Sequence, residues 1–303
     1  MARATNAAGQ RLFIKVFNDA RCGRHEIMIH SLILYAEQLH NQRQDSRRHG
    51  RLDGRITKVI WTGECDGYPV LVMKAEQEAE RPIATPIQLA KFAQEVATTL
   101  AILHDDVTIA HGDIKPYNLV VTKNDGDKQP IRVVICDFGS ADTVYDDALP
   151  DAPMHRTGGT KGYSAPESDG YCTSPESDVY SLGATLRQVM RYIKCKSMRA
   201  LIARMMDSIP ENRPHARDVV EGAKAIQMEL ETTRKRADAA DKTGHPLCGD
   251  NYMRLLPFQR KAVCLAITFA VAADGAHIVY WLLNKAGATV WVQPARIWQH
   301  RFA

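Results

Sequence analysis

The stretch HGDIKPYN, residues 111–118, places an acid (Asp113), a base (Lys115) and an amide (Asn118) within one short loop. Before this loop, apolar residues recur at helical spacing over residues 89–103 and predict a helix. After it, NLVVT and IRVVICDF are rich in β-branched residues and predict the two strands of a β-ribbon. The loop therefore gathers polar, reactive groups at the point where a helix passes into a ribbon.

The composition is that of a globular protein. The chain has 303 residues, of which 45% are hydrophobic and 24% are charged, enough for one large domain or for two lobes with their own cores. The formal net charge of +4 is too small to imply nucleic acid binding, although it is compatible with an anionic small ligand. The seven cysteines form no CxxC pair, so neither a zinc site nor a disulfide framework is predicted and a reducing compartment is the default.

No targeting or membrane signal is evident in the sequence. The N-terminus, MARATNAAGQ, lacks the apolar core of a secretory signal, so we expect an intracellular protein of the cytoplasm or nucleus. The longest apolar run, residues 262–273, falls short of the roughly 20 residues that a membrane helix needs. It predicts a buried helix or strand, and no membrane partner is expected.

Four further motifs follow the loop in a fixed order. They are ICDFGSA (135–141), GTKGYSAPE (159–167), SDVYSLGATL (177–186) and ENRPHARDVV (211–220). One three-residue motif would have little meaning, but five motifs in order are specific. Over roughly residues 11–228, the chain resembles the eukaryotic protein kinase family in the order and near the spacings of its motifs.

This resemblance implies an α+β fold of two lobes. Residues 1–76 would form a small, β-rich N-terminal lobe with one helix, and residues 77–228 a larger, mainly helical C-terminal lobe. The residue patterns agree, because RLFIKVF and ITKVIWTGECDGYPVLVM predict strands and HEIMIHSLILYAEQL predicts a helix between them. Asp66 and Gly67 predict a hairpin turn, and Thr85 followed by proline predicts a helix start.

Residues 229–303 are a C-terminal extension whose role the sequence does not reveal. Its last part, IVYWLLNKAGATVWVQPARIWQHRF, is apolar and aromatic. We expect it to pack on the larger lobe, with partner binding and mistranslated sequence as the alternatives. The sequence carries no signal for an oligomeric state.

The resemblance assigns chemical roles to the loop and to the DFG-like motif. Phosphoryl transfer depends on positioning and on neutralising a crowded anion more than on covalent help. Asp137 and Asn118 would hold Mg²⁺ against the phosphates of ATP, since this ion prefers hard oxygen ligands. Asp113 would accept or orient the proton of the substrate hydroxyl, and Lys115 would offset charge on the transferred group. A purely structural loop is the alternative.

The first lobe would bind the rest of the nucleotide. Lys15 resembles the strand lysine that binds the α- and β-phosphates, and Glu26 resembles its helix partner. They are 11 residues apart, a short interval for this family, which indicates a shortened loop or a different glutamate. Met73 would lie beside the adenine, and residues 74–76, with Ala75 at their centre, would offer backbone groups to the base. The alternatives are a strand-edge lysine and a core methionine.

Five other residues resemble architectural positions of the family. Glu167 and Arg213 resemble the ion pair that ties the activation segment to the late helices, and Asp178 resembles the helix acid that holds the loop backbone. His111 and Phe138 resemble members of the hydrophobic stack that links the lobes.

The chain also departs from the family. Gly112 replaces the usual arginine, which would pair with a phosphorylated activation segment, so we predict activity that does not depend on that phosphate. Only 14 residues with a single glycine, Gly9, precede Lys15. The glycine-rich phosphate loop is therefore expected to be missing, reduced or lost from a truncated sequence. Phe13 replaces a small alanine and would crowd the adenine, and His30 replaces an apolar stack member.

Two functions of different classes follow. The first is a serine/threonine protein kinase that uses ATP and Mg²⁺ on a protein hydroxyl, which the D-x-K-P-x-N pattern and Thr160 favour. The second is a pseudokinase, a binding or scaffold protein that holds nucleotide weakly or not at all, which Phe13 and the short N-terminus favour. The intact Asp113, Asn118 and Asp137 favour the enzyme. A small-molecule kinase is disfavoured by the GT–APE segment, which builds a peptide-docking surface in protein kinases.

Overall fold

The computed structural model describes residues 2–42, 52–76, 83–123, 131–144, 159–168 and 173–243. The predicted apolar segment at 262–273 and the aromatic end of the chain lie outside these residues. Within them, none of the helices is both long and apolar enough to cross a membrane.

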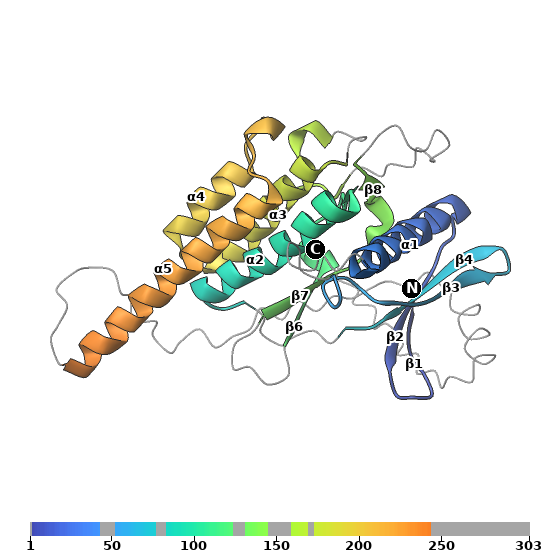
Figure 1. Cartoon of the computed structure of the whole chain (residues 1–303), viewed down its shortest axis with the longest axis horizontal. Coiled ribbons are helices and arrows are strands. Elements are labelled where there is room, and N and C mark those ends of the chain that lie inside the picture. Colours follow the sequence, from blue (N-terminus) through green and yellow to red (C-terminus); the bar gives the residue numbers. More distant parts are fainter. Residues whose placement is uncertain are drawn as a thin grey trace, which may run out of the picture.

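The first lobe is a twisted antiparallel sheet with one helix. Its four strands lie in the order β1-β2-β4-β3, and helix α1 crosses beside them (Figure 1). The bounds are β1 Ala2–Thr5, β2 Arg11–Val16, α1 Ala20–Gln42, β3 Val59–Cys65 and β4 Tyr68–Lys74. Every strand and the helix that the sequence predicted here are present, and the Asp66–Gly67 turn has the positive φ angles of a tight hairpin.

Strand β1 was not predicted. It pairs with β2 through a short turn in which the side chain of Asn6 accepts hydrogen bonds from the N–H groups of Ala8 and Gln10. Gly9 has φ +77°, a conformation that favours glycine. One strand and one turn therefore fit before Lys15, and the described chain has a single strand on that side of β2.

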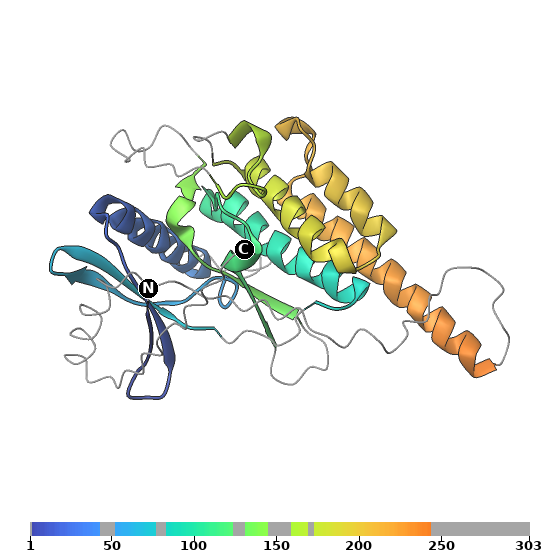
Figure 2. The same cartoon turned by 180° about the vertical axis from the view of Figure 1, so that it is seen from behind.

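The second lobe is mainly helical. Helices α2 to α5 pack beside one another, and the β6–β7 ribbon lies between them and the first lobe (Figures 1 and 2). Their bounds are α2 Pro86–Ile102, α3 Pro175–Val189, α4 Lys196–Met205, α5 Ala216–Thr243, β6 Leu119–Lys123 and β7 Ile131–Ile135. Two further strands have two residues each, β5 Ile109–Ala110 and β8 Asp142–Thr143, and they pair with each other. β5 comes just before the HGDIKPYN loop, and β8 comes just after the DFG-like motif. The α+β, two-lobed fold is thus confirmed.

Two helix starts are fixed by the same local chemistry. Thr85 caps α2 and Ser174 caps α3, and each side chain exchanges hydrogen bonds with the residue three positions later. A proline follows each cap, where its missing N–H costs nothing. The start predicted at Thr85 is confirmed. The expected boundary at residue 228 falls inside α5, which runs on to Thr243, so that domain boundary stays a prediction.

The main core joins the two lobes. Ile29 and Ile33 of α1 are fully buried in the same apolar cluster as Phe138, Leu100 of α2 and Leu182 of α3. Burial of such side chains stabilises the fold by roughly 1.5–3 kcal/mol each. Because α1 is packed into this shared core, the position of Glu26 is coupled to the position of the DFG-like motif.

Candidate active site

A buried carboxylate of α3 holds the HGDIKPYN loop in place. The side chain of Asp178 is fully buried and accepts hydrogen bonds from the N–H groups of His111 (2.7 Å) and Gly112 (2.8 Å). Its Oδ2 also lies 2.9 Å from Nε2 of His104. A buried carboxylate needs such partners, and three of them fix the backbone just before Asp113.

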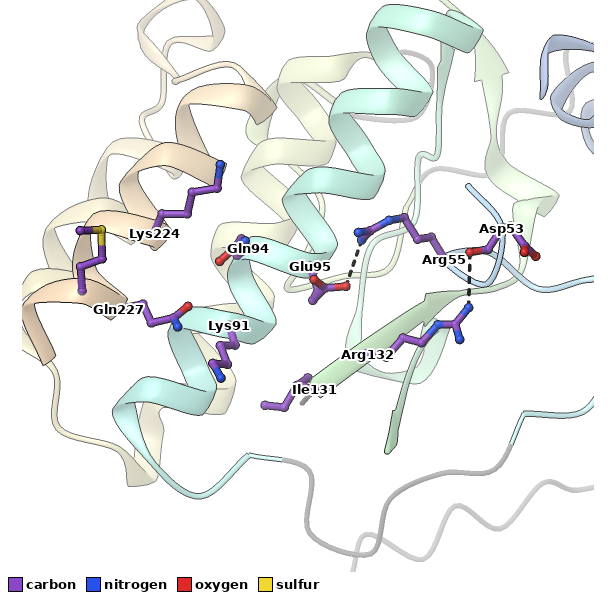
Figure 3. Close-up of a pocket in the computed structure, with 10 residues that line it drawn as sticks. Asp53, Arg55, Lys91, Gln94, Glu95, Ile131, Arg132, Lys224 and Gln227 are labelled. Carbon is purple, nitrogen blue, oxygen red and sulfur yellow. Dashed lines mark hydrogen bonds and ion pairs between the residues drawn. The ribbon is translucent and has the colours of Figure 1, made fainter. Parts of the chain in front are cut away.

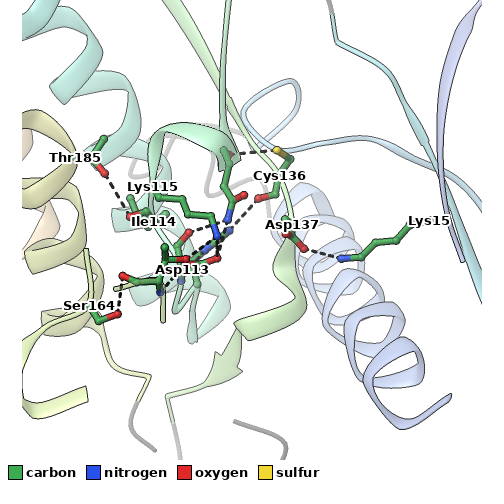
Figure 4. A network of polar contacts seen from close by, with 11 residues as sticks. Lys15, Asp113, Ile114, Lys115, Cys136, Asp137, Ser164 and Thr185 are labelled. Atoms are coloured by element: carbon green, nitrogen blue, oxygen red, sulfur yellow. Dashed lines mark hydrogen bonds and ion pairs between the residues drawn. The ribbon is translucent and has the colours of Figure 1, made fainter. Parts of the chain in front are cut away.

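Asp113 and Lys115 lie side by side in one polar cluster (Figure 4), to which Thr160 also belongs. Nζ of Lys115 lies 2.5 Å from Oδ2 of Asp113 and donates to Oγ1 of Thr160 at 2.7 Å. The Thr160 hydroxyl donates to the other carboxylate oxygen of Asp113 at 2.7 Å, and its N–H does so at 3.2 Å. Both oxygens of Asp113 are therefore oriented by hydrogen bonds from these neighbours.

Asn118 is fixed to the same carboxylate. It lies in the 3₁₀ turn Pro116–Asn118, and its Nδ2 donates to the backbone oxygen of Asp113 (2.9 Å) and to Oδ2 (3.2 Å). This network assigns the amide orientation and leaves Oδ1 of Asn118 available as an acceptor or metal ligand.

Lys15 bridges the two lobes. Its Nζ lies 2.6 Å from Oε2 of Glu26 on α1 and 2.6 Å from Oδ1 of Asp137 in the DFG-like motif. The pairing with Glu26 is present despite the short interval between the two residues. Asp137 has φ +67°, a left-handed conformation that is rare for an aspartate and turns its carboxylate toward Lys15 (Figure 4).

Lys15, Glu26 and Asp137 shift one another's pKa values. Burial alone would raise the pKa of Asp137, but the ion pair and hydrogen bond with Lys15 outweigh it and hold this pKa below its usual value. Burial would lower the pKa of Lys15, whereas Glu26 and Asp137 together raise it. Burial raises the pKa of Glu26, whose Oε1 has no hydrogen-bond partner among the described residues. Lys15 and Asp137 are therefore both charged at neutral pH.

The donors suit a hard divalent cation. Among the described residues, no three His, Cys, Asp or Glu side chains converge on a metal position. Oδ1 of Asn118 and the second oxygen of Asp137, whose side chain is 39% exposed, are the oxygens left over by the network above. One carboxylate and one amide suit Mg²⁺, which commonly completes its shell with phosphate and water oxygens.

An aromatic stack (His30, Phe138 and His111) runs behind these polar groups. The ring of Phe138 meets His30 at 5.1 Å and His111 at 4.9 Å between centroids, both edge to face. All three side chains are buried, and Nε2 of His30 has no hydrogen-bond partner among the described residues. Burial lowers the pKa of His30 to about 4, so this ring is neutral at physiological pH.

The residues expected around the adenine lie at the C-terminal end of β4. Met73 is buried and faces Phe13 across the β2–β4 pair, in one apolar cluster. The N–H of Ala75 donates to the carbonyl oxygen of Arg11 at 3.0 Å. Ala75 can therefore offer a base its carbonyl oxygen but not its N–H, which narrows the role predicted for it.

The activation segment is anchored at its far end by Arg213. This side chain is fully buried and binds Glu167 through two parallel hydrogen bonds of 2.5 and 2.8 Å. It also donates to the backbone oxygens of Glu176 (3.1 Å) and Asp207 (2.9 Å). Such a bidentate pair adds geometric precision as well as energy.

Gly112 occupies a position that a side chain would not fit. Its φ is +77°, and a Cβ atom would lie 2.4 Å from the backbone oxygen of Ser140 and 2.8 Å from Oγ1 of Thr173. The glycine that replaces arginine in the sequence is therefore built into the local packing.

Two contacts were not anticipated from the sequence. From the sequence, Thr160 only favours the serine/threonine branch of the family. In the structure its hydroxyl contacts both Asp113 and Lys115. His25 reaches from α1 to the carbonyl oxygen of Ala141 at 2.7 Å, beyond the DFG-like motif. The place of Thr160 in the GTKGYSAPE motif was the available signal, whereas His25 had none.

Comparison with known proteins agrees with this geometry. The family model described as "Protein kinase domain" matches residues 70–199. The chain is 32% identical over 186 residues to the serine/threonine-protein kinase WNG1 of Toxoplasma gondii, covering 58% of this chain and 26% of that protein. It is 29% identical over 189 residues to the probable serine/threonine-protein kinase PknB of Corynebacterium glutamicum (57% and 28%).

A third relative matches a shorter part of the chain. The proto-oncogene serine/threonine-protein kinase mos of Mus musculus is 35% identical over 100 residues, covering 33% of this chain and 27% of that protein. The chain thus spans about a quarter of the length of these curated relatives. Residues 70–199 are thus similar to the protein kinase domain, and the loop, the Lys15–Glu26 pair and the aromatic stack agree with that similarity.

Proposed function

We propose that the chain transfers the γ-phosphoryl group of ATP to a serine or threonine hydroxyl of a protein, with Mg²⁺ as the metal ion. The observation that carries this proposal is the polar cluster in which both oxygens of Asp113 are oriented by Lys115, Thr160 and Asn118. A cluster that served only as a structural loop would not require an acid, a cation, a hydroxyl and an amide to converge at one place.

In this proposal, Asp113 orients the substrate hydroxyl and takes its proton as the new O–P bond forms. The bond between the γ-phosphorus and the bridging oxygen breaks, and ADP leaves with the electron pair. Lys115 offsets the negative charge on the transferred group. Asn118 and Asp137 hold Mg²⁺, which supplies charge neutralisation at the phosphates.

The first lobe would position the nucleotide. Lys15 binds the α- and β-phosphates and is itself held by Glu26, as the 2.6 Å contact supports. Met73 lies beside the adenine, and Ala75 contributes its carbonyl oxygen. Electrostatic positioning of this kind accounts for most of the catalysis in phosphoryl transfer.

The printed names of the relatives support the serine/threonine class, because all three are serine/threonine kinases. A location in the cytoplasm or nucleus is part of the proposal. It is supported by the thiols of Cys22, Cys136 and Cys195, which form no disulfide in the described chain and suit a reducing compartment.

One observation favours a second candidate, a nucleotide-binding scaffold without transfer activity. Phe13 packs against Met73 on the side of β2 where the family has a small residue, and this bulk would narrow the space for a base. Such a protein would bind nucleotide weakly and leave the Asp113 cluster unused.

The deciding experiment is transfer of radiolabelled phosphate from ATP to a generic protein substrate. We expect incorporation that needs Mg²⁺ and that falls by roughly 10²–10⁴-fold in Asp113→Asn. The matched control, Asp66→Asn, makes the same chemical change in an exposed hairpin turn and should keep full activity. Equal incorporation by Asp113→Asn and the intact protein would refute the proposal. No incorporation by a protein that still binds Mg-ATP would support the scaffold instead.

A further inference from the structure

A cavity of about 640 Å³ lies between α2, α5, β7 and the segment 52–56 (Figure 3). No residue of the candidate active site lines it. Its lining consists of Asp53, Arg55, Lys91, Gln94, Glu95, Ile131, Arg132, Lys224, Gln227 and Met228. Four of these side chains are basic and two are acidic, so the cavity has an excess of positive charge.

Two of the basic side chains are held rigidly. Arg55 pairs with Glu95 at 2.9 Å, with both side chains about a quarter exposed. Arg132 donates from Nε to the backbone oxygen of Gly54 at 2.7 Å and from Nη2 to that of Asp53 at 3.3 Å (Figure 3). These two arginines form a fixed wall of the cavity.

Gly54 is part of that wall. It has φ +68°, and a Cβ atom at this position would lie 1.0 Å from Nη2 of Arg132. The backbone therefore leaves room for the guanidinium where any other residue would collide with it. A guanidinium that is fixed in advance loses little conformational entropy when it binds an anion.

The two lysines, Lys91 and Lys224, are less strongly paired with carboxylates than Arg55 is. Lys91 of α2 has no carboxylate partner among the described residues. Lys224 of α5 contacts Glu221, one turn earlier on the same exposed helix face, at 2.7 Å. Exposed pairs of this kind contribute little and exchange readily, so both ammonium groups can serve an incoming anion.

We propose that this cavity binds an acidic peptide segment of a partner protein. Its volume suits a ligand of several residues rather than a lone ion. The amide of Gln94 can both donate and accept hydrogen bonds, as a peptide backbone requires. The amide of Gln227 offers its oxygen as an acceptor, while its nitrogen donates to Glu231 at 2.7 Å. Ile131 and the exposed Met228 add apolar surface beside the charges. This binding does not depend on phosphoryl transfer.

The test measures fluorescence anisotropy of a labelled nine-residue glutamate-rich peptide, with its glutamine-for-glutamate analogue as reference. We expect the full chain to bind the acidic peptide at least about tenfold more tightly than the analogue. The variant Lys91→Glu/Lys224→Glu should weaken this binding at least about tenfold and gain affinity for a lysine-rich peptide.

The matched control is Lys235→Glu/Arg236→Glu, which makes the same change in net charge on exposed residues further along α5. It should bind like the unmodified chain. Equal weakening by the two double variants would overturn the proposal, because the attraction would then come from overall charge. Displacement of the peptide by millimolar inorganic phosphate at constant ionic strength would contradict a peptide site. The milder Lys91→Ala/Lys224→Ala variant repeats the test if the charge reversal lowers the melting temperature.

Discussion

At the scale of single residues, His30 is the least compatible with its surroundings. It is 2% exposed, and Nε2 has no partner among the described residues. Protonation would place a charge in the core beside Phe138, within reach of the positive charge of Lys15. Burial accordingly lowers its pKa to about 4, against about 6.5 in an unfolded chain.

This lowered pKa makes stability depend on pH. Between pH 6.5 and 4 the unfolded chain binds a proton at His30 that the folded chain does not, so acid destabilises the fold. We expect the unmodified chain to lose about 2 kcal/mol more than His30→Leu between pH 7.5 and pH 5. Urea unfolding of both proteins at the two pH values measures the difference. The exposed His215→Gln should follow the unmodified chain, and parallel pH profiles for His30→Leu and the unmodified chain would contradict this account.

Glu167 also makes the fold less stable in acid, but at a lower pH than His30 does. Burial would raise its pKa, but the hydrogen bonds with Arg213 hold it below the usual value. A lowered carboxyl pKa contributes stability that is present above the unfolded pKa and is lost as the pH falls through the folded one.

Glu167→Gln should therefore destabilise the chain by about 2 kcal/mol at pH 7, because Arg213 is left buried with a weaker partner. The difference in stability between Glu167→Gln and the unmodified chain should shrink below about pH 4.5, where Glu167 begins to be protonated in the unfolded chain. Thermal melts across this range measure it. A destabilisation that stays constant down to pH 3 would show that the ion pair is not the cause.

Most polar residues of the candidate site could be found from the sequence because each belongs to a short motif with chemical content. Asp113, Asn118 and Asp137 are examples. In the structure Asn118 donates a hydrogen bond to Asp113, and Asp137 pairs with Lys15. The contact of Thr160 with Asp113 joins residues 47 positions apart, and that of His25 with the backbone oxygen of Ala141 crosses between the lobes, so no local pattern encodes either. The backbone bond that removes the N–H of Ala75 from use likewise depends on strand register.

At the scale of elements, the described part of the activation segment, residues 137–144 and 159–168, is held by hydrogen bonds at two points. Asp113 and Lys115 bind Thr160 in its second half, and Arg213 binds Glu167 at its end. Gly112 removes the cation that would respond to a phosphate and packs against Ser140.

We therefore expect kinase activity to remain within about twofold after phosphatase treatment. The measurement compares phosphate transfer by treated and mock-treated protein, after the phosphatase has been removed. Gly112→Arg should not restore phosphate control, and its positive φ and close contacts should cost about 1–3 kcal/mol of stability. Near-complete loss of activity on phosphatase treatment would contradict this account of the segment.

Elements with long periodic patterns were predictable, and short ones were not. Helix α2 and strands β3, β4, β6 and β7 follow their apolar patterns closely. Strand β1, with the sequence ARAT, lacks such a pattern and is fixed instead by its pairing with β2. The cavity at Lys91 could not be predicted either, because α2 and α5 meet there from positions more than 120 residues apart.

At the scale of the whole molecule, the two lobes are coupled through three links that share α1. Glu26 binds Lys15, which also pairs with Asp137 of the larger lobe. His30 contacts Phe138 edge to face, and Ile29 and Ile33 enter the core of the larger lobe. Any shift of α1 therefore changes the ion pair and the DFG-like motif together. The order of motifs along the chain predicted this architecture, since each motif occupies a fixed place in a two-lobed fold.

In the proposed mechanism, Asn118 and Asp137 hold a divalent cation against a nucleotide that Lys15 binds. Isothermal titration calorimetry of ATP binding, with and without Mg²⁺, tests this most directly. We predict that Mg²⁺ tightens ATP binding at least about tenfold, and that Asp137→Asn abolishes this dependence while Asp66→Asn preserves it. Equal affinity with and without Mg²⁺, or no difference between Asp137→Asn and the unmodified chain, would contradict it.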